Sequence, residues 1–333
     1  SVKLSIQYGN TSASAMAYAC YGIIASNTIQ DVNTGVKFGQ LAVRVVSKFD
    51  VKAAKPEVSI VEGLFTFHRK SHVRETLALL KEGYTTALEL GDLEFAGRNV
   101  YGFCLNSFWC GQSLATLEEE TKAYCNQFVQ LNQLITANYC RIYWQSILNL
   151  LGVAEHPTIL SGEALEEVEF LPQLIEANDI FGLHFFYGCK LMLCYLFGEI
   201  ESAQNHAVEI RRYLMVAAGT VGEPAFYFYD SLTALATLNI QRSHKEVLEQ
   251  VEKNQTQLQQ QWANYAPMNH QHKVDLVAAE IYRIKGEKLE AIELYDKAIS
   301  GAKQNEYIQE EALANELAAK FYLNWGKEKV AQA

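Results

Sequence analysis

Apolar residues recur at helical spacing in the last part of the chain and indicate a pair of helices. The run from Leu276 to Ile284 predicts one helix, which ends at Gly286. The apolar positions of a second predicted helix then fall on one face: Leu289, Ile292, Tyr295, Ala298, Ile299 and Ala302. Two antiparallel helices joined by a short turn form a helical hairpin, so this segment predicts a hairpin that turns at Gly286.

The same change from one apolar helical run to the next occurs along the whole chain. Glycines mark it at Gly35, Gly91, Gly152, Gly198 and Gly326. A further junction, without glycine, is expected near Arg242. No stretch alternates apolar and polar residues long enough to predict a strand. We therefore expect an all-α fold, a tetratricopeptide-like superhelix of antiparallel helical hairpins (an α-solenoid). Residues 1–333 would form a single helical-repeat domain, longer and irregular over 1–155 and more regular over 156–333.

The hairpin near the C-terminus partly fits a tetratricopeptide repeat. Tyr282, Gly286 and Ala298 have the spacing of the aromatic residue, the glycine and the alanine of that repeat. In this interpretation the glycine lies where two helices approach closely. Other positions depart from the pattern, since Lys285, Ala302 and Asn305 replace its Leu, aromatic residue and Ala.

Composition favours a folded, helical, acidic protein. Half of the 333 residues are apolar and only 5 are proline. The net charge of −10 is uneven: residues 1–150 hold 13 Lys/Arg and 12 Asp/Glu, whereas residues 151–333 hold 15 and 26. An acidic half argues against a nucleic-acid partner, because phosphates require a basic surface.

Cysteines and hydropathy indicate a cytoplasmic protein. The 7 cysteines form no C-x-x-C pair, which is typical of reduced, buried thiols. The most apolar window, His184–Gly198, contains Lys190 and is too short to span a bilayer, so we expect no membrane insertion. The chain begins without Met and stops just after a predicted helix start, so we expect it to be a fragment of a larger protein.

Motifs of catalysis are missing from the sequence. It contains neither a Walker A motif nor G-x-G-x-x-G, and no kinase catalytic-loop or D-F-G motif. His68 and His72 stand at i, i+4, as zinc ligands can, but Arg69 occupies the place of the acid, so a solvated helix end is favoured over a metal site. His270 and His272 flank a predicted loop and are interpreted in the same way. We therefore expect no enzyme activity, no cofactor and no metal in this segment.

Clustered acids and aromatic residues are the remaining candidates for function. Acid runs at 117–121, 163–169 and 308–313 are interpreted as solvated helix starts. Aromatic residues are dense at 99–110, 138–148, 184–188 and 225–232, where consecutive rings point around the whole helix. Most should fill the core, but some could line a groove for a peptide or a ligand. The candidates are Tyr101, Phe108, Trp109, Tyr143, Trp144, Phe186 and Tyr227.

Several phrases of the sequence resemble one family. "KLMLCYLFGEIESA", "FYFYDSLTALA", "YAPMNHQHKVDLVAAEIYR" and "NEYIQEEALANELAAKFYLNWGKEKVAQA" are similar to the helical-repeat segment of large cyanobacterial signalling kinases. The resemblance implies a parent protein with a serine/threonine kinase, a STAND-type AAA ATPase, a GAF domain and a sensor histidine kinase. ATP and Mg would then bind only in flanking domains. It transfers no catalytic residue, so none of His68, His72 and His184 is expected to be a phosphoacceptor.

Two functions are favoured over a third alternative, an unrecognised hydrolase or transferase on a helical scaffold. The first is a non-catalytic regulatory module that binds a protein, a peptide or another domain of the same polypeptide and relays this state to kinase output. The second is a small-molecule sensor with a pocket formed by the aromatic segments.

Overall fold

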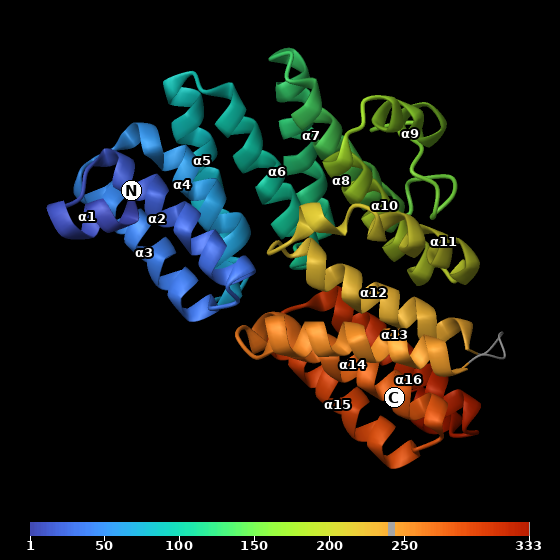
Figure 1. The fold of residues 1–333 in the computed structure, drawn as a ribbon. Helices are drawn as coiled ribbons and strands as arrows, with labels where there is room; N and C mark the ends of the chain where they lie inside the picture. Colours follow the sequence, from blue (N-terminus) through green and yellow to red (C-terminus); the bar gives the residue numbers. More distant parts are fainter. Residues whose placement is uncertain (239–243, 333) are drawn as a thin grey trace.

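The computed structural model describes residues 1–238 and 244–332, and every regular element in these residues is a helix (Figure 1). The α-helices are α1 (Val2–Tyr8), α2 (Ser12–Ile23), α3 (Val32–Lys48), α4 (Lys55–Val61), α5 (Glu75–Leu90), α6 (Leu93–Trp109), α7 (Leu114–Gln130), α8 (Leu134–Leu150), α9 (Glu167–Glu176), α10 (Ile180–Leu196), α11 (Ile200–Arg211), α12 (Gly222–Thr237), α13 (His244–Gln257), α14 (Pro267–Lys285), α15 (Lys288–Gln304), α16 (Ile308–Asn324) and α17 (Glu328–Ala331). The expected all-α fold is confirmed.

Short π- and 3₁₀-helices extend or connect several of these elements. The π-helical segments are η1 (Ile24–Thr28), η3 (Glu62–Thr66) and η6 (Leu258–Ala263). The 3₁₀ segments are η2 (Lys52–Ala54), η4 (Phe67–Arg69) and η5 (Leu214–Ala217). Single-turn π segments are uncommon and often lie at functional sites.

The helices pack as consecutive antiparallel pairs. The pairs are α2 with α3, α5 with α6, α7 with α8, α10 with α11, α12 with α13, and α14 with α15. One helix of each later pair belongs to an inner series in which α4, α6, α8, α10, α12, α14 and α16 contact one another in turn. This arrangement is a helical-repeat solenoid, in which each hairpin stacks on its neighbours.

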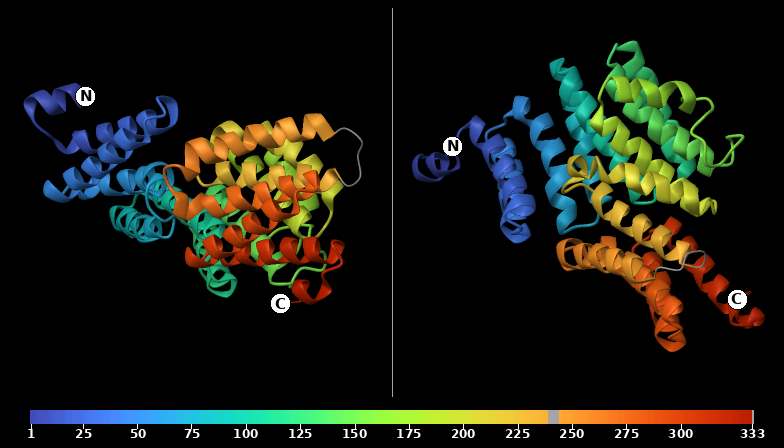
Figure 2. Two further views of the ribbon diagram at one scale, coloured as in Figure 1. Left: turned by 90° about the horizontal axis from the view of Figure 1, so that it is seen from below. Right: turned by 45° about the vertical axis from the view of Figure 1, so that its right-hand side comes forward.

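The solenoid curves back on itself. In Figure 1 the chain runs from α1–α5 on the left, over α6–α8, to α11 on the right, and returns along α12–α16 below. The two views of Figure 2 show the same return, with α14 reaching toward the N-terminal helices. Hydrogen bonds join residues 68–74 to residues 261–273 and 305–310, so segments about two hundred positions apart in sequence are in direct contact.

Turns between helices contain a residue with positive φ. Gly91, Gly198, Gly286 and Gly326 have φ between 72° and 81°, and each ends one helix directly before the next, as expected. The sequence reasoning missed four further turns, in which Gly111, Asn132, Asn178 and Glu306 take this conformation. Glycine adopts it freely and Asn tolerates it better than most residues, so the two Asn turns carry a recognisable signal.

Alanine at a fixed distance after the turn residue defines the repeat better than glycine alone. Gly91, Asn132, Gly198 and Gly286 are each followed five positions later by an alanine, and these are Ala96, Ala137, Ala203 and Ala291. All four alanines are fully buried. The expectation that Gly286 lies at a close helix approach was wrong, because a Cβ at Gly286 would meet nothing within 4 Å. Gly286 forms the turn, and the small buried alanines allow the close approach.

Two of the expected junctions need correction, and a third falls outside the residues that the structure describes. Gly35 is not a junction, since it lies inside α3; the chain turns earlier, where Gln30 has a φ of 62°. Gly152 ends α8, but a loop follows it and α9 begins only at Glu167. The junction expected near Arg242 lies outside the described residues.

Gly35 has a packing role instead. A Cβ at Gly35 would lie 1.9 Å from Ser26 Oγ and 2.7 Å from the backbone oxygen of Gly22 on α2. We expect Gly35→Ala to push α3 from α2 and to lower the free energy of unfolding by about 1–3 kcal/mol. Thermal unfolding followed by circular dichroism measures the loss. The control is Gly188→Ala in α10, whose added Cβ would make only an ordinary 3.4 Å contact with Ile210; equal melting temperatures for the two variants would contradict the assignment.

Cysteines follow the expectation of buried thiols with one exception. All seven are free; six are buried and Cys20 on α2 is exposed.

Candidate functional site

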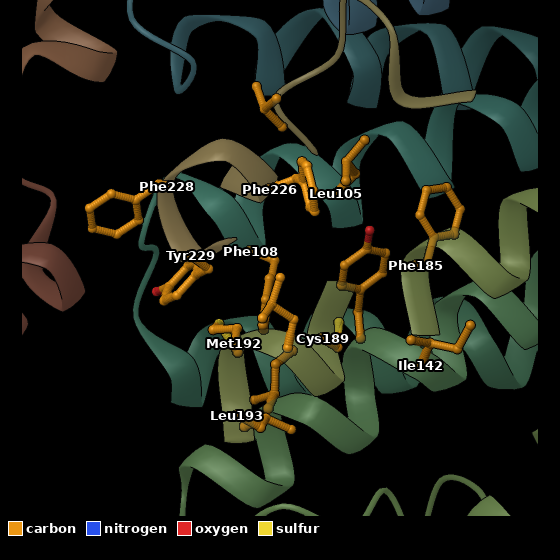
Figure 3. Packing of buried hydrophobic residues seen from close by; sticks show 14 of the residues in the cluster. Leu105, Phe108, Ile142, Phe185, Cys189, Met192, Leu193, Phe226, Phe228 and Tyr229 are labelled. Atoms are coloured by element: carbon orange, nitrogen blue, oxygen red, sulfur yellow. The ribbon is translucent and has the colours of Figure 1, made fainter. Parts of the chain in front are cut away.

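Four of the seven candidate aromatic residues meet in the middle of the inner series. Phe108 lies 5.2 Å from Trp109 and 5.4 Å from Tyr143 between ring centroids. Phe185 of α10 joins Tyr143 to Tyr101. Figure 3 shows Phe108, Phe185 and Tyr229 coming together from α6, α10 and α12. The aromatic rings thus fill the seams between adjacent inner helices.

The other three candidates lie apart from this group. Trp144 donates a hydrogen bond to Glu118 on α7, and Phe186 is fully buried beside Tyr187. Tyr227 donates to Glu223 one turn earlier on α12.

Space for a ligand is small among the grouped rings. The cavity bounded by Trp109, Tyr143, His184, Phe185 and Tyr229 has a volume of about 10 Å³. That volume suits a single water molecule, whereas sites for organic ligands usually measure hundreds of cubic ångströms. A metabolite could bind there only if the inner helices moved apart.

A larger groove opens between α10, α12, α14 and α16. Its volume is about 330 Å³. The apolar residues that line it are Tyr195, Leu196, Ile200, Ala236, Leu313, Leu317 and Phe321. We call it the C-terminal groove. It is the size of the smaller sites that hold organic ligands or a few side chains of a peptide.

Charged residues at the C-terminal groove are paired within the protein. Arg283 donates to Glu280 at 2.7 Å, and the hydroxyl of Tyr295 also donates to Glu280. Glu316 and Lys320 form an exposed ion pair on α16. Because its four charges are mutually compensated, the groove offers mainly apolar contact area.

A second candidate region is the contact between the two distant parts of the solenoid. We call this contact the seam. In it, residues 68–74, from η4 to the start of α5, pack against residues 261–273 and 305–310. Asn269 of α14 is at its centre and is fully buried. Its side-chain oxygen accepts from the Val73 amide (3.1 Å) and the Tyr307 hydroxyl (2.9 Å). Its nitrogen donates to the carbonyls of His68 (3.0 Å) and Ser71 (2.8 Å), so one side chain holds three segments together.

Arg69 forms the part of the seam near the three π segments. Its guanidinium donates to Asn27 of η1 (3.1 Å) and to the Gln261 carbonyl of η6 (2.7 Å). It also lies 4.0 Å from the ring centroid of Trp262. Burial lowers the pKa of Arg69 to about 10, although Glu223 and Tyr265 oppose this shift. Arginine remains charged at that value, so the seam contains a buried cation.

Lys273 of α14 and Glu310 of α16 form a buried ion pair on the C-terminal side of the seam. Lys273 Nζ lies 3.1 Å from Glu310 Oε1, with side chains only 6% and 2% exposed. The ammonium also donates to the Asn269 carbonyl and to His272 Nε2, and it lies 4.2 Å from the centroid of Tyr307. Burial lowers the pKa of Lys273 and raises that of Glu310, because leaving water disfavours both charges.

Arg74 closes the outer edge of the seam. Its guanidinium forms an ion pair with Glu306 and donates to the carbonyls of Cys110 and Gly111 at the end of α6. The α15–α16 turn is therefore attached to both α5 and α6.

Four histidines of the seam are not the solvated side chains that were expected. His68, His270 and His272 are at most 3% exposed, and His72 is half-buried. His68 and His72 share no helix face, because η4 ends at Arg69 and α5 begins at Glu75. His270 and His272 lie within α14 rather than beside a loop. No group of three or more His, Cys, Asp or Glu side chains in the described residues is arranged to hold a metal ion.

Two of the acid runs also contain a carboxylate that forms an ion pair with a buried lysine. Glu310, expected to be solvated, is buried against Lys273. Glu167 accepts from Lys190, which is buried in the apolar segment of α10. A charged residue inside an apolar run was the available signal for the second pair, whereas nothing local distinguishes Glu310 from its half-buried neighbour Glu311.

Comparison with known proteins adds one distant similarity. No protein-family model matches the chain. A segment of 131 residues is 24% identical to Hybrid signal transduction histidine kinase G of Dictyostelium discoideum. The match covers 39% of this chain and 4% of that protein, so the chain spans only a small part of the relative's length. Separately, none of the helices in residues 1–238 and 244–332 combines the length and apolar character needed to cross a membrane.

Proposed function

We propose that the chain is a non-catalytic interaction module of a multi-domain signalling protein and that it binds a polypeptide segment in the C-terminal groove. The single observation that carries the proposal is this groove of about 330 Å³, whose apolar lining comes from α10, α11, α12 and α16. Inner surfaces of helical solenoids are suited to extended partners, because successive hairpins present a continuous concave face.

The signalling setting rests on sequence similarity. The partial relative is named a hybrid signal transduction histidine kinase, and the sequence resembles the repeat segment of signalling kinases. In this proposal the partner is a protein, a peptide or another domain of the same polypeptide. Catalysis, ATP and Mg belong to other domains of the parent protein.

Peptide selection tests the binding function. A random dodecapeptide library displayed on phage is selected on the wild-type protein, and enriched peptides are synthesised for fluorescence anisotropy. Ala236→Phe fills the groove from its wall, so we expect it to raise the Kd of such peptides about tenfold or more. Ala123→Phe is the matched control, because Ala123 is exposed on α7 away from the groove. Failure to enrich any sequence, or equal binding to both variants, would contradict the proposal.

A further inference from the structure

The seam sets the curvature of the solenoid. Hairpins in a solenoid normally contact only their neighbours along the chain, so the overall curvature is a sum of small local rotations. Here Asn269, Arg69 and Arg74 tie the region before α5 directly to α14 and to the α15–α16 turn. Breaking this contact would leave every hairpin intact while freeing one part of the superhelix from the other.

Closure of the seam leaves several buried polar atoms without a hydrogen-bond partner in the protein. Both ring nitrogens of His270, Nε1 of Trp262, Nε of Arg69 and Nδ1 of His272 are in this state among the described residues. A cavity of about 10 Å³ lies beside His270 and Lys273. Each unsatisfied buried polar group destabilises the closed state, and water would satisfy it in an open state. The hydrogen bonds that stabilise the closed seam are therefore opposed by the cost of removing water from these buried polar groups.

We infer that the seam is a reversible latch that opens as the solution becomes acidic, separating the N-terminal hairpins from the C-terminal ones while the helices remain folded. Four histidines, His68, His72, His270 and His272, lie at this one contact, and it already holds the cations Arg69, Arg74 and Lys273. The facing acids are engaged: Glu310 with Lys273, Glu306 with Arg74, and Glu223 with the Gly219 amide and the Tyr227 hydroxyl. Glu75 accepts from the His72 amide, and the neutral groups Cys110, Tyr229, Tyr265 and Tyr307 complete the surroundings.

Protonation favours the open state because the closed seam holds these histidines neutral. Burial, with Arg69 beside it, lowers the pKa of His68 to about 3, and burial lowers the pKa of His72, His270 and His272 as well. In the open state the rings regain water and bind protons near the ordinary value of about 6.5. Closure is therefore fully stable above that pH and weakens as the pH falls below it, because the open form takes up more protons.

Distance measurement between spin labels tests the latch. Exposed Cys20 is replaced by Ser, and labels are attached at Lys37→Cys on α3 and Lys297→Cys on α15, both exposed. At pH 7.5 we expect one narrow distance distribution. At pH 5.5 we expect a second population at longer distance that disappears on return to pH 7.5, with unchanged far-ultraviolet circular dichroism. An unchanged distribution, or a change that tracks loss of helix, overturns the inference.

Variants separate the latch from general destabilisation. Asn269→Leu removes the central hydrogen bonds and should populate the longer distance already at pH 7.5. His270→Phe removes one proton acceptor and two unsatisfied nitrogens, so the midpoint of opening should move down by about half a pH unit or more. The control is His206→Gln on α11: burial lowers the pKa of His206 to about 4, but its ring lies against Tyr187, away from the seam. An equal shift in the His206 variant, or no shift in the His270 variant, overturns the inference.

Discussion

Replacing Lys273 with Met is expected to lower the free energy of unfolding by about 3–5 kcal/mol, because it leaves the buried carboxyl group of Glu310 without its cation. The same change removes the hydrogen bonds from Nζ to the Asn269 carbonyl and to His272. A methionine side chain can still contact the ring of Tyr307, so the loss is attributed mainly to the uncompensated polar groups. Urea denaturation at pH 7.5, followed by circular dichroism, measures it.

The double variant Lys273→Met/Glu310→Leu distinguishes an unpaired charge from lost packing. Replacing both members of a buried ion pair with apolar residues of similar size is often nearly neutral, so the double variant should recover most of the stability lost in Lys273→Met. Lys320→Met on α16 is the control, since its pair with Glu316 is exposed and worth at most about 1 kcal/mol. A Lys273→Met protein as stable as Lys320→Met would show that the buried pair contributes nothing to folding.

Local sequence signals were sufficient for most of the fold. The junctions at Gly91, Gly198, Gly286 and Gly326 are visible because the left-handed turn conformation favours glycine, and the apolar periodicity on either side predicts the paired helices. Asn132 and Asn178 form the same turn and could have been found from the buried alanine or leucine five positions later. Gly35 was misinterpreted because a glycine inside a helix and one at a turn look alike without a neighbouring helix to compare.

The seam could not be predicted from the same local signals. His68, Arg69 and Arg74 form a polar run typical of a solvated helix end, and their partners lie about two hundred positions away. Whether such a run is buried depends on the accumulated curvature of all the hairpins between the two segments. Periodicity reports which face of each helix is apolar, but it gives no measure of that curvature.

Candidate binding residues show a similar division. The aromatic density of α6, α8, α10 and α12 was visible in sequence, and the structure places Tyr101, Phe108, Trp109 and Tyr143 together in the packed interior. The C-terminal groove instead combines residues such as Leu196 and Leu317, which have ordinary core spacing on separate helices. Their meeting at an open groove follows from how α16 is placed relative to α10, which no local pattern encodes.

Glu62 is a buried acid of a different kind, because it has no partner. It lies in the π-helical segment η3, is fully buried, and neither of its carboxyl oxygens has a hydrogen-bond partner among the described residues. Gly39 on α3 makes room for it, since a Cβ there would lie 1.9 Å from Glu62 Oε2. Burial raises the pKa of Glu62 to about 8, and the nearby Thr66 hydroxyl opposes this shift.

We expect Glu62→Gln to make the protein more stable than the wild type as the pH rises. Between the ordinary carboxyl pKa and about 8, the folded wild type holds a proton on Glu62 that the unfolded chain has released. Its free energy of unfolding therefore falls with rising pH, by up to about 1.4 kcal/mol per pH unit, and glutamine cannot titrate. Urea denaturation of both proteins from pH 5 to 8 should thus show a difference in free energy of unfolding that widens to a few kcal/mol.

Glu89→Gln is the control. Lys52 lowers the pKa of this exposed carboxyl group, so it is ionised in both states over this range and the difference from the wild type should stay constant. A constant difference for Glu62→Gln as well would mean that the folded protein ionises Glu62, and that α2–α4 open enough to hydrate it.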